Sequence, residues 1–228
     1  MSVRDNLQRV RERIAAAASR AGRDPSEITV VAVSKTKPAS MIREAVSAGV
    51  SILGENRIQE AEQKIAQLPE LPARWHLVGH LQTNKAKKAV RLFDLVHSVD
   101  SPRLVEALNR AADDDGKRQP ILLQINIAGE QQKFGTSPEE FEALLDAALN
   151  APFLEVKGLM VMPPYCENPE DSRPHFRALR ETAERYADKL SATGQRIELS
   201  MGMTGDFEVA IEEGATMVRI GTAIFGER

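Results

Sequence analysis

Short apolar runs alternate with amphipathic stretches along the whole chain. The first amphipathic stretch follows Ser2, where apolar residues recur at steps of three and four, and it stops near Gly22. The run 28–34, ITVVAVS, is rich in β-branched residues and almost wholly apolar, which is typical of a parallel strand buried on both faces. Similar runs recur down the chain. They predict strands over residues 28–34, 50–53, 75–78, 92–99, 120–127, 154–162, 196–200 and 217–220.

The stretches between these runs have the apolar spacing and the end signals of helices. Thr83 is a candidate helix cap, residues 137–140 form a capping box, and residues 176–194 predict one long amphipathic helix. Eight strands separated by helices in 228 residues predict a single (β/α)8 barrel of the TIM type, an α/β fold. A doubly wound open sheet is the alternative, but so many regular units in so short a chain favour closure.

Little chain follows the last predicted strand, so an eighth outer helix has almost no room. We expect the extra N-terminal helix to cover that gap. No linker or low-complexity tract interrupts the alternation, and we therefore expect residues 1–228 to form one domain.

The composition indicates the cellular compartment and excludes some classes of partner. Lysine and arginine total 30, aspartate and glutamate total 33, and the net charge of -3 gives no reason to expect a nucleic-acid partner. The single cysteine, Cys166, excludes an intramolecular disulfide and indicates a reducing compartment. No apolar signal region and no apolar window of ~20 residues is present. These features predict a cytoplasmic protein that does not bind a membrane.

Lys35 is the residue that most strongly indicates a particular chemistry. The active sites of such barrels lie where the strands end, and Lys35 directly follows the first predicted strand. Strand alternation places it on the same side as Val31 and Val33, where burial would lower its pKa and favour Schiff-base chemistry. The alternative is an ammonium paired with a carboxylate such as Glu55. Lys37 has the same parity but lies outside the strand, and we expect it to be exposed.

Hydroxyl and glycine residues follow the seventh and eighth predicted strands. Ser200, Thr204 and Gly205 follow the seventh, and Gly221 and Thr222 follow the eighth. These two loops of a barrel commonly bind phosphate through backbone N–H groups, and a helix expected to begin near residue 206 would add its positive end. Glycines that only permit tight turns are the alternative.

Two further polar residues have alternative explanations. Arg219 lies inside an apolar run and needs a partner if it faces inward, for which a structural ion pair would suffice. Asn56 could cap a helix or reach the pocket, and the cap is favoured when the residue is considered alone. No metal site is predicted, because His76 and His80 lie four apart on or just after a strand without an acidic cluster. The residues alone thus predict a phosphate-binding barrel with an inward lysine.

Six motifs, in order along nearly the whole chain, resemble those of the pyridoxal phosphate (PLP) homeostasis protein family. They are AVSKTKP at 32–38, GEN at 54–56, WHLVGHLQTNK at 75–85, GLM at 158–160, LSMGM at 199–203 and VRIG at 218–221. One departure is Thr204, where the family pattern has serine, and the hydroxyl is retained.

The resemblance implies a barrel like the N-terminal domain of alanine racemase. It also implies that PLP is bound to Lys35 as an internal aldimine. The other implied roles are phosphate binding by Ser200, Thr204, Gly221 and Thr222, contact with the pyridine nitrogen by Arg219, and contact with the cofactor by Asn56. An arginine at the ring nitrogen can only donate a hydrogen bond, so it would weaken the electron sink that carbanion chemistry uses.

The resemblance further implies a cofactor-homeostasis protein without established catalysis, so no catalytic residue is assigned. Alanine racemase has a second domain that supplies a catalytic tyrosine, and the only tyrosines here, Tyr165 and Tyr186, lie elsewhere. We expect a monomer that binds PLP and passes it to apo PLP-dependent enzymes. Two alternatives stay open: a racemase-like PLP enzyme acting on amino acids with Lys35 as its own base, and an aldolase-type barrel in which Lys35 forms an imine with a sugar phosphate.

Overall fold

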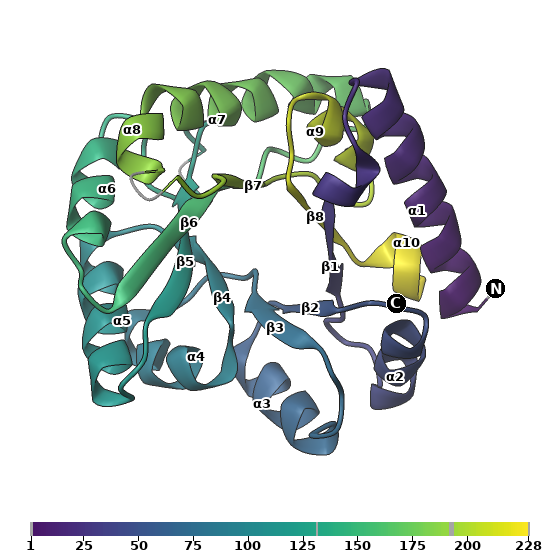
Figure 1. Cartoon of the computed structure of the whole chain (residues 1–228), viewed down its shortest axis with the longest axis horizontal. Coiled ribbons are helices and arrows are strands. Elements are labelled where there is room, and N and C mark those ends of the chain that lie inside the picture. Colours follow the sequence, from purple (N-terminus) through teal and green to yellow (C-terminus); the bar gives the residue numbers. More distant parts are fainter. Residues whose placement is uncertain (1, 131, 192–193, 228) are drawn as a thin grey trace.

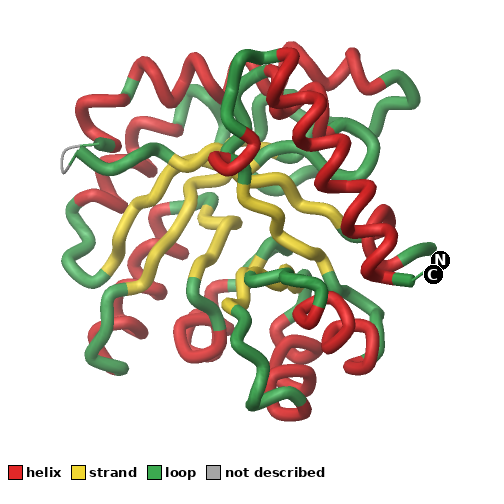
Figure 2. The backbone as a smooth tube through the Cα atoms, turned by 45° about the vertical axis from the view of Figure 1, so that its right-hand side comes forward, coloured by secondary structure: helices red, strands yellow, loops and turns green. Residues whose placement is uncertain are grey.

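The computed structural model describes residues 2–130, 132–191 and 194–227, which fold into a closed barrel of eight strands in sequence order (Figures 1 and 2). The barrel closes where the first strand pairs with the eighth in parallel, and every other neighbouring pair is parallel too. The predicted barrel is thus confirmed, and the open sheet is excluded. The strands are β1 Thr29–Val33, β2 Ile52–Glu55, β3 Arg74–Leu77, β4 Leu95–Val99, β5 Gln119–Ile125, β6 Leu154–Val161, β7 Glu198–Ser200 and β8 Met217–Ile220.

Helices surround the barrel (Figure 1). They are α1 Val3–Arg20, α2 Ala39–Ser47, α3 Ile58–Gln67, α4 Ala86–Leu92, α5 Pro102–Asp114, α6 Phe141–Leu149, α7 Arg173–Arg185, α8 Ala187–Leu190, α9 Phe207–Glu212 and α10 Thr222–Phe225, with 3-10 turns η1 Pro25–Glu27, η2 Thr83–Lys85 and η3 Pro169–Ser172. The last helix has only four residues, and α1 packs against α2, α9 and α10. The N-terminal helix therefore covers the gap, as expected. None of the described helices is long and apolar enough to cross a membrane.

Alternation along each strand divides the apolar core into two layers. One layer fills the space between the strands and the helices. The other lies inside the barrel and consists of Val31, Val33, Ile52, Val78, Leu95, Leu122, Met160 and Met217. Since Val31 and Val33 face inward, the chain leaves β1 with the next inward position at Lys35, as its parity predicts.

Several local predictions were wrong at the ends of elements. Thr83 begins the 3-10 turn η2 rather than capping an α-helix. The Ser137 hydroxyl does accept from the N–H of Glu140, at 3.2 Å, but α6 begins only at Phe141. The predicted long helix breaks at Tyr186, whose ψ of 19° is not helical, and continues as α8. The errors at Thr83 and Ser137 concern local signals that an isolated turn also satisfies.

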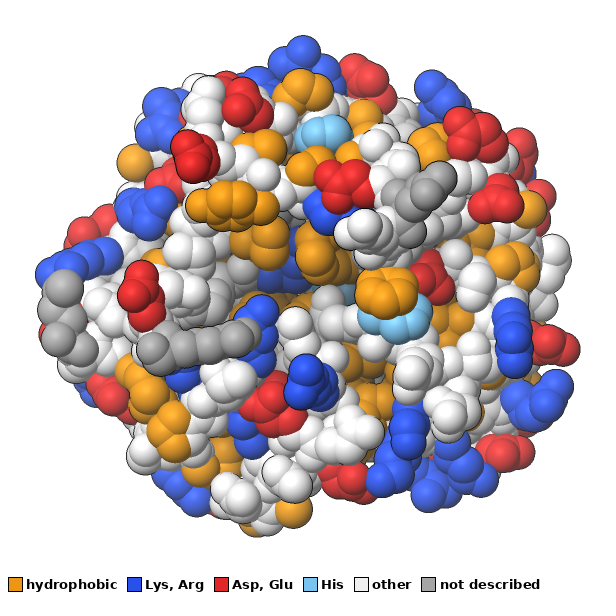
Figure 3. All heavy atoms as spheres, turned by 180° about the vertical axis from the view of Figure 1, so that it is seen from behind, with side chains coloured by type: hydrophobic (Ala, Val, Ile, Leu, Met, Phe, Trp, Pro, Cys, Tyr) orange, Lys and Arg blue, Asp and Glu red, His pale blue; other side chains and the backbone are white. Residues whose placement is uncertain are grey.

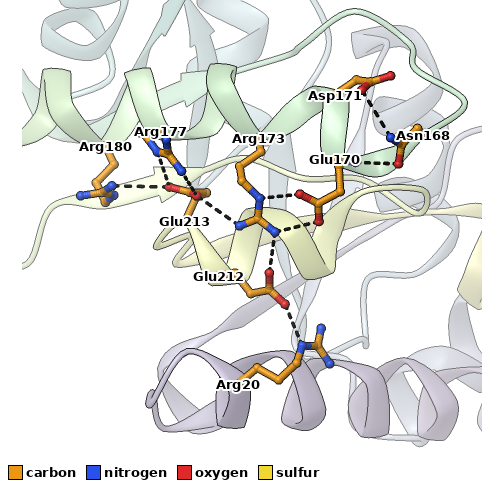
Figure 4. Close-up of polar contacts among 9 residues, drawn as sticks. All are labelled: Arg20, Asn168, Glu170, Asp171, Arg173, Arg177, Arg180, Glu212 and Glu213. Carbon is orange, nitrogen blue, oxygen red and sulfur yellow. Dashed lines mark hydrogen bonds and ion pairs between the residues drawn. The ribbon is translucent and has the colours of Figure 1, made fainter.

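An ion-pair network joins α1, α7 and α9 on the outside of the barrel (Figure 4). Arg173 contacts Glu212 at 2.7 Å and Glu213 at 3.1 Å, and Arg20 on α1 contacts Glu212 at 2.8 Å. Arg177 and Arg180 also contact the largely buried Glu213 carboxylate. Because α9 directly follows the loop after β7, this network fixes the helix behind that loop.

Glu213→Gln is expected to lower the free energy of unfolding by about 1–3 kcal/mol, because the amide leaves part of three guanidinium contacts unmade. Urea unfolding at neutral pH measures this loss. Glu184→Gln, which removes only an exposed pair with Arg180, is the matched control and should change stability by less than about 0.5 kcal/mol. Equal stability of the Glu213 variant and the wild type would contradict the prediction.

The loss should also depend on pH. Burial raises the pKa of Glu213, but hydrogen bonds from Arg177 and Arg173 outweigh burial and set the pKa below its usual 4.5. The Glu213 contribution is therefore present above the usual pKa and is lost as the pH falls through the lowered one. The difference between the variant and the wild type should shrink in acid.

Candidate functional site

A cavity of about 330 Å³ opens at the C-terminal end of the strands. Figure 3 shows this face hollowed near its centre, with hydrophobic and basic side chains around the hollow. The lining includes predicted site residues from β1, β2, β7 and β8 or the segments that follow them; these are Lys35, Asn56, Thr204, Arg219, Gly221 and Thr222. The volume lies in the range of ordinary small-molecule sites.

Another cavity, of about 470 Å³, lies under α1 at the opposite end of β1 and β2. The guanidinium of Arg11 in its wall already donates to the carbonyls of Ala48 and Gly49. This cavity brings together none of the residues singled out from the sequence. The C-terminal cavity is therefore the candidate site.

The structure distinguishes the two lysines after β1. The Lys37 ammonium donates to the carbonyls of Gly226 and Glu227, each at 2.8 Å, so Lys37 is half-buried rather than exposed as expected. The Lys35 ammonium forms no ion pair or hydrogen bond with any residue that the structure describes. The carboxylate considered as its partner, Glu55, pairs instead with Lys64 at 2.6 Å. Of the two amines, Lys35 is the one left available for a ligand.

A buried cluster holds the turn that carries Lys35. Thr36 adopts a φ of 63°, a left-handed conformation that is costly for a side chain with a branched Cβ, and its N–H donates to Glu60. Lys64 donates to the Ser34 carbonyl at 2.6 Å and also contacts the carboxylates of Glu55 and Glu60. Burial raises the pKa of Glu55, against the opposing hydrogen bonds from Lys64 and Ser34. The cluster thus holds the strained turn at Ser34 and at Thr36, on either side of Lys35.

Lys64→Met is expected to lower the free energy of unfolding by about 3 kcal/mol, because it leaves the Glu55 carboxylate buried without its cation. Chemical denaturation measures the change. Lys88→Met is the matched control, since it removes an exposed pair with Glu62 on the neighbouring helices and should have almost no effect. The prediction is wrong if the two variants are equally stable.

Arg219 is a buried cation at the base of the cavity. Its side chain is 3% exposed, and it donates to the Ser200 hydroxyl at 2.7 Å and to the Val161 carbonyl at 2.9 Å. No described carboxylate lies within ion-pair distance, so the structural ion pair considered from the sequence is not observed. Burial lowers its pKa to about 10, which still leaves the guanidinium charged at neutral pH. Asp206, in the cavity wall, opposes this shift from beyond ion-pair distance. Arg219 therefore brings to the site a positive charge that no carboxylate contacts directly.

Ser200 is the residue of the predicted phosphate set that lies deepest in the barrel. Its side chain is fully buried inside the barrel, does not line the cavity, and is engaged by Arg219 and by His97 at 2.9 Å. Asn56, in contrast, lines the cavity, while the cap position of α3 belongs to Arg57, so the cap that was favoured for Asn56 alone is wrong. A Cβ at position 79 would lie 2.3 Å from the Asn56 carbonyl oxygen, so Gly79 lets the segment after β3 pack closely against Asn56.

The segments after β7 and β8 form one wall of the cavity. The backbone N–H groups of Thr204, Gly205 and Gly221 donate to no acceptor in the described parts of the chain. The Thr204 hydroxyl accepts from the N–H of Ala223 at 3.4 Å, which links the two segments. Asp206 also lines this wall, with its carboxylate accepting from the N–H of Met203 at 2.6 Å. Free N–H groups with a hydroxyl beside them can bind the oxygens of an anion such as phosphate.

Sequence reasoning missed the segment after β6. Met162, Pro164, Tyr165 and Cys166 all line the cavity. The Cys166 thiol contacts the Pro164 carbonyl at 3.6 Å, and the Tyr165 side chain is 90% exposed. The only signal was their place after a predicted strand, because their position opposite Lys35 depends on barrel closure.

Comparisons with known proteins identify the family of this chain. The family model for the alanine racemase N-terminal domain matches residues 6–228. The Pyridoxal phosphate homeostasis protein of Aquifex aeolicus is 44% identical over 228 residues, covering 100% of this chain and 99% of that protein. Its Escherichia coli K12 counterpart is 42% identical, covering 98% of this chain and 95% of that protein.

Solved structures give the same result. PipY of Synechococcus elongatus PCC7942, with PLP bound, has a TM-score of 0.81 and 40% identity, covering 93% of this chain and 100% of that chain. An alanine racemase of Clostridium difficile, 15% identical with a TM-score of 0.72, shares the fold over 100% of this chain but only 57% of its own. The chain therefore belongs to the family of pyridoxal phosphate homeostasis proteins, whose barrel is the alanine racemase N-terminal domain.

Proposed function

We propose that this chain is a cytoplasmic protein that binds PLP in the C-terminal cavity through Lys35 and serves intracellular PLP homeostasis without catalysing a reaction. One observation carries the proposal: an amine without a described partner, a buried cation that no described carboxylate contacts, and a wall of N–H groups without described acceptors meet in one cavity of about 330 Å³. When bound, PLP supplies an aldehyde that reacts with amines and a ring that can withdraw electrons.

The residues present fit the three functional ends of that cofactor. Lys35 would bind the aldehyde carbon, and the segments after β7 and β8 would hold the phosphate through Thr204, Gly221 and Thr222. Arg219 would meet the pyridine nitrogen, and Asn56 would contact the ring from β2. Ser200 is assigned to Arg219 rather than to the phosphate, because its hydroxyl is already engaged inside the barrel.

Two features favour binding over catalysis. A guanidinium can only donate, so Arg219 would keep the ring nitrogen unprotonated and weaken the ring as an electron sink. Among the described lining residues, none is a histidine or a glutamate, and the one aspartate, Asp206, is engaged by a backbone N–H. The other proton-carrying side chains in the lining are Lys37, which donates to the Gly226 and Glu227 carbonyls, Cys166, whose thiol donates to the Pro164 carbonyl, and Tyr165, which is 90% exposed. No hydrogen bond in the described parts of the chain holds any of them beside Lys35 as a second acid or base.

The spectrum of the purified protein tests the proposal, before and after borohydride reduction with mass spectrometry of the product. We expect a lysine-bound cofactor band and a reduced adduct on Lys35. Mixing the loaded protein with an apo PLP-dependent enzyme should restore that enzyme faster than the spontaneous loss of cofactor allows. Steady turnover of any member of an amino-acid panel would support the racemase-like alternative instead.

The aldolase alternative has its own signature. Borohydride trapping that needs a sugar phosphate, and not PLP, would support it and overturn the cofactor proposal. The expected monomer stays a prediction, which light scattering coupled to size-exclusion chromatography checks.

A further inference from the structure

Four polar side chains form a continuous hydrogen-bonded line inside the barrel. His76 Nδ1 lies 3.0 Å from His97 Nε2, His97 Nδ1 lies 2.9 Å from Ser200 Oγ, and Arg219 Nη1 lies 2.7 Å from the same hydroxyl. The four residues come from β3, β4, β7 and β8, and none is more than 3% exposed. The line ends at the base of the candidate site, where Arg219 lines the cavity.

The chemistry of the groups sets the direction of the line. Arginine has no acceptor, so the Ser200 oxygen accepts from Arg219, and the single hydroxyl proton is left to donate. Its other described partner is His97 Nδ1, which must therefore be unprotonated. A neutral His97 then carries its proton on Nε2 and donates to His76 Nδ1. If His97 carried its proton on Nδ1 instead, the buried Ser200 hydroxyl proton would have no acceptor, which is costly.

This direction explains how Arg219 is buried without a carboxylate. Each donor in the line points away from the guanidinium, so the lone-pair end of each dipole faces the cation. Burial lowers the pKa of His76 to about 3 and that of His97 well below its usual value, with smaller contributions from Arg74 to the first and from His76 and Arg219 to the second. Both rings are thus neutral, as the line requires. A carboxylate in their place would hold Arg219 equally well but would cancel its charge.

We propose that Ser200, His97 and His76 are positioning residues that hold Arg219 at the base of the cavity as a cation without a directly paired carboxylate, through a line of donors with one direction. The proposal rests on the proposed function, because it presents that cation to the ring nitrogen of PLP. Ser200 thereby acts on the cofactor through Arg219 and not through the phosphate.

The first test uses the protein without cofactor. Long-range 1H–15N NMR of histidine-labelled protein at neutral pH should show His76 and His97 neutral, each with its proton on Nε2. In Ser200→Ala the 15N chemical shift of His97 Nδ1 should move toward the value of an unprotonated ring nitrogen that accepts no hydrogen bond. A proton on Nδ1 of His97, or a charged ring, overturns the proposal whether or not PLP binds.

The second test uses the loaded protein and compares three serine variants. Ser200→Ala should still form the Lys35 adduct but should shift the absorbance of the cofactor and weaken its binding about 10-fold, while Ser200→Thr, which keeps the hydroxyl, should restore the wild-type spectrum. Ser98→Ala is the matched control, because it removes another buried strand hydroxyl, one that donates to the Gly79 carbonyl at 2.7 Å.

The outcomes separate the two proposals. If the wild type forms no adduct, the proposed function fails, and the NMR result still decides the direction of the line. If the wild type and Ser200→Ala both form the adduct with the same spectrum and affinity, the positioning role is wrong while the cofactor proposal stands. If Ser98→Ala shifts the spectrum as much as Ser200→Ala does, the Ser200 effect is one of general destabilisation. That result would also overturn the positioning role of Ser200.

Discussion

Lys35→Ala is expected to abolish the lysine-bound cofactor band and to weaken PLP binding on the order of 100-fold, because the phosphate wall and Arg219 would then hold the cofactor without a covalent bond. The physical reason is that Lys35 offers the amine without a described partner in the cavity wall. Absorbance titration with PLP and mass spectrometry after borohydride reduction measure both effects.

Lys37→Ala is the matched control, two positions along and in the same cavity wall. It removes hydrogen bonds to the carbonyls of Gly226 and Glu227 and should keep the band. A band that disappears in Lys37→Ala and survives in Lys35→Ala would exchange the two assignments. If neither residue carries an adduct, the proposal that the cavity binds PLP through a lysine is wrong.

Acid is expected to destabilise the fold strongly through the two buried histidines. In the unfolded chain a histidine takes up a proton near pH 6.5, whereas burial lowers the folded pKa of His76 to about 3 and that of His97 well below 6.5. The unfolded state therefore binds more protons as the pH falls, and stability drops by about 1.4 kcal/mol per pH unit for each histidine. Between about pH 6.5 and pH 4.5 His76 alone should cost about 2 kcal/mol, and His97 should add to that loss.

Urea unfolding across that pH range measures the loss, and NMR titration of the two rings measures its cause. His175→Gln, which removes a half-buried histidine on α7, should leave the acid loss unchanged. Constant stability from neutral pH to about pH 4.5, or titration of His76 near pH 6.5 in the folded protein, would contradict the expectation.

Local periodicity accounts for how much of the fold could be predicted. A strand buried on both faces must be apolar at successive positions, and a helix that covers it must be apolar at steps of three and four, so the eight units are visible one at a time. The ends of the helices were harder to predict, because a capping residue such as Ser137 can cap a single turn as well as a helix. Lys35 could be found because its inward direction follows from its own strand.

The sequence by itself therefore determined the barrel, the inward lysine and the polar segments after the last two strands, since each depends on neighbours in the chain. Only the tertiary structure decided which groups meet. In the folded barrel Glu55 forms its ion pair with Lys64 and not with Lys35, and Lys37 donates to a carbonyl of the C-terminal segment. His76, His97 and Ser200 form a hydrogen-bonded line to Arg219. These partners lie on separate strands or helices, and their contacts exist only once the barrel closes, because closure sets the distances and removes the water that would otherwise satisfy each polar group.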